Sequence, residues 1–142
     1  MSMIVAVLLM PPLLASCLAI LVRPYKRFVG WVSLIGASLS FAASIALCTT
    51  VVAGGPLQDA GSATALWRVD ALSALLALCI AFVALLASAL AQRVGRPDRE
   101  ELARTRHFRI FTNAFVFTML AAVTVQNVAL MWVAIEATTI TS

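Results

Sequence analysis

The sequence is poor in charged residues and has no residue spacing typical of a metal or redox site. Only 11% of its 142 residues are charged, against about 25% in soluble domains. The three cysteines, Cys17, Cys48 and Cys79, lie in separate apolar stretches without CxxC or Cys/His spacing. We interpret them as small packing residues. Nucleotide-binding glycine motifs and haem ligand pairs are also missing, so we expect no cofactor, no metal and no catalytic redox residue.

Apolar residues are abundant instead. They make up 63% of the chain, and the mean hydropathy is +1.03. A soluble chain of this length cannot bury so much apolar surface, so the sequence predicts an all-α integral membrane protein with one polytopic domain. No Lys or Arg precedes the first apolar stretch, which argues against a secretory signal peptide. We expect four full transmembrane helices and a truncated fifth, at about residues 3–22, 28–53, 69–91, 108–126 and 128–142.

Residues inside the apolar stretches predict how the helices begin and pack. Pro11 and Pro12 lie in the middle of the first stretch and are expected to kink it. Asp70 lies in the first turn of the third, where its carboxylate is expected to cap the helix. Small residues recur every three or four positions in the second and third stretches, which predicts smooth faces for close helix packing. They are Gly36, Ser40 and Ser44, and Ala77, Ala81, Ala84 and Ser88.

Basic residues gather in two connectors, which would lie on the same side if every stretch spans the membrane. The positive-inside rule then places both connectors, including the hydrophilic segment 92–107, in the cytoplasm and the N-terminus outside. We expect a multi-pass protein of the cell (cytoplasmic) membrane, with the lipid bilayer as a partner. Basic and aromatic residues are not interleaved, so no nucleic-acid partner is expected. The basic residues of these connectors are Arg23, Lys26, Arg27, Arg93, Arg96, Arg99, Arg104 and Arg106.

Glu136 is the candidate functional residue, as the one acid in the last apolar stretch. It lies eight residues past Val128, about 12 Å along a helix and near mid-depth of a bilayer core. Trp132 and Thr139 are expected to share its helix face, and nearby threonines could bond backbone carbonyls or hold a water beside the acid. Arg109 should lie too far away, by about 14 Å in depth, to pair with it. Glu136 is then protonated, paired with a basic residue that this chain lacks, or a neutral packing residue.

Two stretches resemble a known family. The first is FVFTMLAAVTVQNVALMWVAIEATTITS, from Phe115 to Ser142, and the second runs from Arg68 to Leu75. Both are similar to the antiporter-like membrane subunits of respiratory complex I, multisubunit cation/proton antiporters and membrane-bound hydrogenases. The first stretch most resembles the hydrogenase-4 component F type. Glu136 matches the family's fifth-helix glutamate, which the resemblance implies is part of a proton path, with Thr139 and Trp132 in support.

The resemblance implies a proton-translocating subunit without a redox centre, in a hydrogenase- or NADH dehydrogenase-like complex of several membrane subunits. The family's partner lysine lies on a later, broken helix that this sequence does not contain. We therefore expect a fragment, or a split subunit completed by another polypeptide that supplies the missing C-terminal helices. Two alternatives remain: a subunit of a cation/proton antiporter or ion-coupled transporter, and a small structural or degenerate membrane protein.

Overall fold

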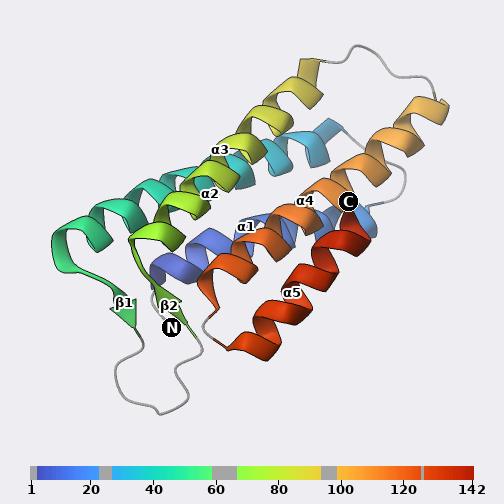
Figure 1. Cartoon of the computed structure of the whole chain (residues 1–142). Coiled ribbons are helices and arrows are strands. Elements are labelled where there is room, and N and C mark those ends of the chain that lie inside the picture. The colour runs from blue at the N-terminus through green and yellow to red at the C-terminus, as the bar shows by residue number, and fades with distance from the viewer. Residues whose placement is uncertain (1–2, 23–26, 59–66, 94–98, 126) are drawn as a thin grey trace.

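In a computed structural model the described residues of the chain form five helices and one pair of very short strands (Figure 1). The structure describes residues 3–22, 27–58, 67–93, 99–125 and 127–142. Four of the helices are long and apolar enough to cross a membrane, as the sequence predicts. The elements are α1 (Met3–Leu21), α2 (Arg27–Gly54), β1 (Leu57–Gln58), β2 (Arg68–Val69), α3 (Ala71–Arg93), α4 (Arg99–Thr124) and α5 (Val128–Thr141).

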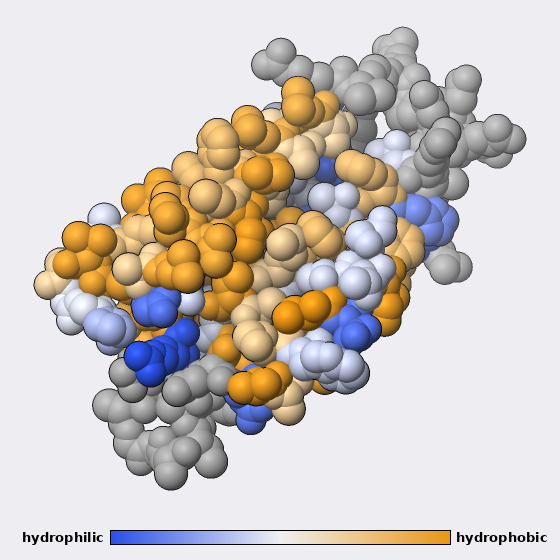
Figure 2. Space-filling model, viewed as in Figure 1, coloured by the Kyte–Doolittle hydropathy of each residue, from blue (hydrophilic) through white to orange (hydrophobic). Residues whose placement is uncertain are grey.

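Helices α1 to α4 form a bundle, and α5 packs against the outside of α4 (Figure 1). Helix α1 lies between α2 and α4, and α3 closes the other side by contacting α2 and α4. The ends of α1 and α3 and the starts of α2 and α4 lie at one end of the bundle, while the strands lie at the other. Apolar side chains cover the α3 side of the surface (Figure 2), which together with the four long helices indicates a multi-pass membrane protein.

The prolines of α1 meet the small-residue face of α2. Helix α1 runs through both Pro11 and Pro12 without interruption. Because Pro12 has no N–H, it cannot bond the Leu8 carbonyl four residues earlier; the Ser40 hydroxyl donates to that oxygen instead, at 3.0 Å. A Cβ on Gly36 would lie 3.4 Å from the Pro11 carbonyl oxygen. The small face therefore lets α2 approach α1 closely and replaces a hydrogen bond that the helix has lost.

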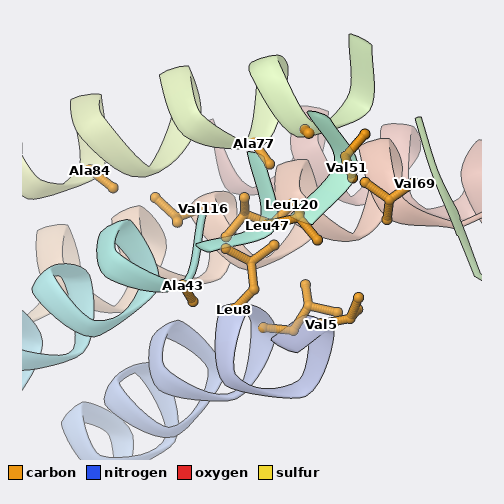
Figure 3. Packing of buried hydrophobic residues seen from close by; sticks show 12 residues of the cluster. Val5, Leu8, Ala43, Leu47, Val51, Val69, Ala77, Ala84, Val116 and Leu120 are labelled. Atoms are coloured by element: carbon orange, nitrogen blue, oxygen red, sulfur yellow. The ribbon is translucent and has the colours of Figure 1, made fainter. Parts of the chain in front are cut away.

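The apolar core lies between the four bundle helices. Leu8, Leu47 and Leu120, from α1, α2 and α4, are fully buried and point toward one another (Figure 3). The small residues predicted to lie at helix interfaces are buried as well, with Ser44 and Ala77 completely enclosed. Small residues at these positions allow the helix backbones to come close, which is how membrane helices gain packing energy.

The cysteines and two helix starts differ from the predictions. Cys48 is half-buried and its thiol donates to the Ala74 carbonyl at 3.3 Å, whereas Cys17 and Cys79 are exposed and do not pack between helices. Helix α4 begins at Arg99, so the second half of the predicted 92–107 connector is helical; residues 94–98 lie outside the described part. Glu, Arg and Ala are strong helix formers, so this helix extends beyond the apolar stretch that revealed it.

Helix α3 begins at Ala71, two residues later than predicted. Arg68 and Val69 pair instead with Gln58 and Leu57 as antiparallel strands. Asp70 then caps α3, its carboxylate accepting a hydrogen bond from the Ser73 backbone N–H at 2.8 Å. This bond holds the pKa of Asp70 below its ordinary value of 3.8, and the Arg68 guanidinium adds a smaller effect in the same direction. The predicted capping role of Asp70 is confirmed.

Candidate functional sites: Glu136 and a buried polar cluster

Helix α5, which carries Glu136, starts at a side-chain cap. The Asn127 carboxamide oxygen accepts hydrogen bonds from the backbone N–H groups of Ala129, at 2.9 Å, and Leu130, at 3.4 Å. These bonds satisfy donors that the first turn of a helix leaves free. Gln126, the last residue of the predicted fourth helix, lies outside the described residues.

Glu136 lies on the side of α5 that faces away from α4. The half-buried residues of α5 recur at helical spacing and mark the side that contacts α4; they are Met131, Ala134, Ala137, Thr138 and Thr141. At about 100° per residue, Glu136 lies nearly opposite their centre. Trp132, Glu136 and Thr139 are all exposed, so the structure brings the three predicted site residues together on one outward face.

The threonines near Glu136 bond the backbone of their own helix. Thr138 donates to the Ile135 carbonyl at 2.6 Å, and Thr139 donates to the Glu136 carbonyl at 2.6 Å. These bonds confirm that the hydroxyls reach the preceding turn. No donor among the described residues bonds the Glu136 carboxylate, which keeps its full hydrogen-bonding capacity for a group outside the described part of the chain.

A groove runs between α4 and the last turn of α5, but Glu136 does not line it. Its volume is about 480 Å³, and its walls are mainly aromatic and aliphatic. Glu136 points to the other side of α5, so this groove offers the acid no enclosed path. The lining residues are Phe108, Phe111, Thr112, Phe115, Ile140, Thr141 and Ser142.

Arg109 has a different neighbourhood from Glu136, as its predicted depth required. Its side chain is 4% exposed, and one terminal nitrogen, Nη2, donates to the Ala91 carbonyl in the last turn of α3 at 3.3 Å. A cation at the carbonyl end of a helix is favourably placed relative to the helix dipole. The Nε atom of Arg109 and the Nε2 atom of Gln92 are buried, and neither has a hydrogen-bond partner among the described residues.

A buried polar pair lies one turn from Arg109 and was missed by the sequence analysis. The Ser33 hydroxyl of α2 donates to the Asn113 Oδ1 atom at 3.1 Å, and Asn113 Nδ2 donates to Ser33 Oγ at 3.0 Å. Ser33, Ser88, Arg109 and Asn113 help to line a small cavity of about 10 Å³. The i, i+4 spacing of Arg109 and Asn113 was the signal that could have revealed this polar face of α4.

Arg106 joins α4 to the end of α1. Its Nε atom donates to the Ala19 carbonyl at 2.9 Å and its Nη2 atom to the Ile20 carbonyl at 2.7 Å. Both carbonyls belong to the last turn of α1, where backbone acceptors lack partners within the helix. Arg106 is thus a structural cap, a role that its position in a basic connector did not predict.

Glu136 therefore differs in chemistry from the buried polar side chains around Arg109. These side chains, Arg109, Gln92, Ser33 and Asn113, are called the Arg109 cluster. Glu136 is a proton acceptor or donor with an open side, and the cluster is a set of buried hydrogen-bond donors around a cation. They lie on different faces of the α4–α5 pair, so they do not form a common catalytic centre. A comparison with models of known protein families gives no match, and no curated protein matches the chain.

Proposed function

We propose that this chain is part of a proton-translocating membrane subunit of a hydrogenase- or NADH dehydrogenase-like complex, with Glu136 as the proton-carrying residue. The observation that carries the proposal is the acid itself, on an apolar helix and on the face directed away from α4. A charged residue inside a membrane is costly and usually functional. The resemblance of residues 115–142 to the antiporter-like subunits supports the same assignment.

The chemistry follows from what surrounds Glu136. A carboxyl group can bind and release one proton. In this proposal, a basic group or a chain of waters from an adjoining polypeptide segment exchanges that proton with Glu136. Trp132 and Thr139 flank the acid and would limit which groups reach it.

The proposed setting is the cytoplasmic membrane, with the N-terminus outside and the basic ends of α2 and α4 in the cytoplasm. This orientation follows the positive-inside rule. The other membrane subunits would cover the outward face of α5 and supply the partner of Glu136. Electron transfer would take place in other subunits, and this chain would contribute the proton path.

The decisive experiment is Glu136→Gln in the assembled complex, in inverted membrane vesicles. We expect dye-detected proton uptake, driven by the complex's electron donor, to fall about tenfold or more, because glutamine cannot exchange a proton. Electron transfer measured in uncoupled vesicles should remain. Asp70→Asn is the matched control: it is the same change of acid to amide, outside the apolar helices, and asparagine still caps a helix.

Two outcomes would change the assignment. Unchanged proton uptake per electron in Glu136→Gln would remove Glu136 from the path. Proton movement that needs a sodium gradient and continues without an electron donor would assign the chain to a cation/proton antiporter instead.

A further inference from the structure

The Arg109 cluster contains a cation whose counter-charge is not among the described side chains. A buried guanidinium without an anion is strongly unfavourable. Two carboxylates are described: Asp70 caps α3 at the opposite end of that helix, and Glu136 faces outward from α5. Neither contacts Arg109, so no described side chain supplies its counter-charge.

The Gln92 and Arg109 side chains lie against the same glycine of α2, and each has one donor that is unpaired among the described residues, Gln92 Nε2 and Arg109 Nε. A Cβ on Gly30 would lie 3.1 Å from Gln92 Nε2 and 3.2 Å from Arg109 Nη2, so both side chains lie against the bare backbone of α2. The adjacent cavity, of about 10 Å³, has room for about one oxygen atom. A ligand that inserts a single anionic oxygen there would lie beside Arg109, which lines the cavity, and would supply its counter-charge.

The depth of the cluster indicates what carries that oxygen. The apolar part of α4 begins at Thr105, so Arg109 lies one turn, about 6 Å, inside it. This is near the level of lipid headgroups. Phe108, which also lines the cavity, is 54% exposed, so the cavity lies next to the outer surface of the bundle. Basic pockets between membrane helices at this level suit anionic headgroups.

We propose that Arg109 binds a phosphate oxygen, supplied by an anionic phospholipid of the leaflet at this end of the bundle. The phosphate would supply a counter-charge to Arg109 and tie the ends of α2, α3 and α4 together. This site is independent of Glu136 and of the proton-translocation proposal. Free phosphate offers the same chemistry, and the experiment separates the two sources.

The test uses the full chain purified in an uncharged detergent. Native mass spectrometry measures binding of phosphatidylglycerol, of diacylglycerol with the same acyl chains, and of inorganic phosphate. We expect phosphatidylglycerol to bind at least about tenfold more tightly than diacylglycerol, and Arg109→Gln to weaken its binding about tenfold, because a charge-assisted hydrogen bond is lost. Arg106→Gln is the matched control and should weaken binding less than about threefold.

A second variant guards against misfolding of Arg109→Gln. Gly30→Ala keeps every charge and donor but places a methyl group against the Gln92 and Arg109 side chains. We expect it to retain its helical circular dichroism and to bind phosphatidylglycerol several-fold more weakly. Unchanged affinity in both variants, or equal affinity for diacylglycerol, would overturn the proposal. Inorganic phosphate that competes at equal concentration would overturn the lipid assignment and identify free phosphate as the ligand.

Discussion

The four-helix bundle and α5 differ in where their polar side chains lie and in what these side chains bond. In the bundle, Ser33, Ser40 and Asn113 are buried and bond groups on neighbouring helices. In α5 no residue is buried, and the hydroxyls of Thr138 and Thr139 bond only their own helix. The bundle bonds its buried polar side chains internally, apart from Arg109 Nε and Gln92 Nε2, whereas α5 directs Glu136 and Thr139 away from α4.

The bundle is therefore the rigid support of the chain, and α5 is its exposed part. The bundle fixes the position of α4, and α4 is the one bundle helix on which α5 rests. Glu136 is therefore held at a defined height without being enclosed. An acid in this position is open to any group that lies beside the outward face of α5.

The largest expected effect comes from the core of the bundle. Leu47 is fully buried, and truncation to alanine should reduce the free energy of unfolding by about 2 kcal/mol or more, mainly through the cavity it leaves. The loss should lie toward the low end of the usual range, because lipid is as apolar as leucine. Unfolding by increasing dodecyl sulfate in mixed micelles, followed by circular dichroism, measures the difference.

Ile135→Ala on α5 is the control, since this residue is 47% exposed. We expect a change of about 0.5 kcal/mol or less. Equal losses at both positions would mean that α5 is as tightly packed as the bundle, and the contrast between the two regions would be wrong.

The comparison also explains what the sequence could reveal. The helices could be predicted because the length of an apolar stretch can be seen in the sequence itself. The faces of small residues on α2 and α3 could be predicted because those residues recur at helical spacing. The partners of polar side chains depend on which helices become neighbours. Ser40 was predicted as part of a smooth face, but its bond to the Leu8 carbonyl requires α1 and α2 to be docked. Arg106 and Asn113 were missed for the same reason.

Glu136 was identifiable because an acid in an apolar stretch is unusual whatever its surroundings. Its direction was not identifiable, because the side of α5 that contacts α4 emerges only when the helices are assembled. Arg109 was predicted to lie too far from Glu136 to pair with it, and no described contact joins the two. The burial of Arg109 against Ala91 and Gln92 depends on the relative position of α3 and α4, which no local pattern encodes.

A smaller effect should come from the hydrogen bond between α1 and α2. Ser40→Ala leaves the Leu8 carbonyl without a donor, and we expect a loss of about 1 kcal/mol. In a Pro12→Ala background the helix can supply its own N–H to that carbonyl, so Ser40→Ala should be less damaging there. A double-mutant cycle, measured by the same unfolding experiment, gives the coupling.

Thr139→Ala is the α5 counterpart of this test. Its hydroxyl bonds the carbonyl of its own helix and joins no two helices, so the change in unfolding free energy should be within about 0.5 kcal/mol. An equal loss of stability from Ser40→Ala in the wild-type and Pro12→Ala backgrounds, meaning no coupling, would show that the proline does not create the need for the Ser40 hydroxyl.

The smallest effect concerns the caps of α3 and α5, which differ in charge but share a geometry. Asp70 accepts the Ser73 N–H, and its pKa is lowered in the folded chain; Asn127 accepts equivalent bonds but has no acidic proton. A lowered folded pKa means that the stabilisation is present above the unfolded pKa and is lost as the pH falls through the folded pKa.

Wild type should therefore lose more stability than Asp70→Asn between neutral pH and a pH below 3.8, and Asn127→Asp should lose more than wild type. Unfolding at several pH values measures both differences. The difference in unfolding free energy should be small, because Asp70 is partly exposed and solvent screens its charge. Identical acid sensitivity in wild type and Asp70→Asn would show that the α3 cap stabilises the helix through its hydrogen bond and not through its charge.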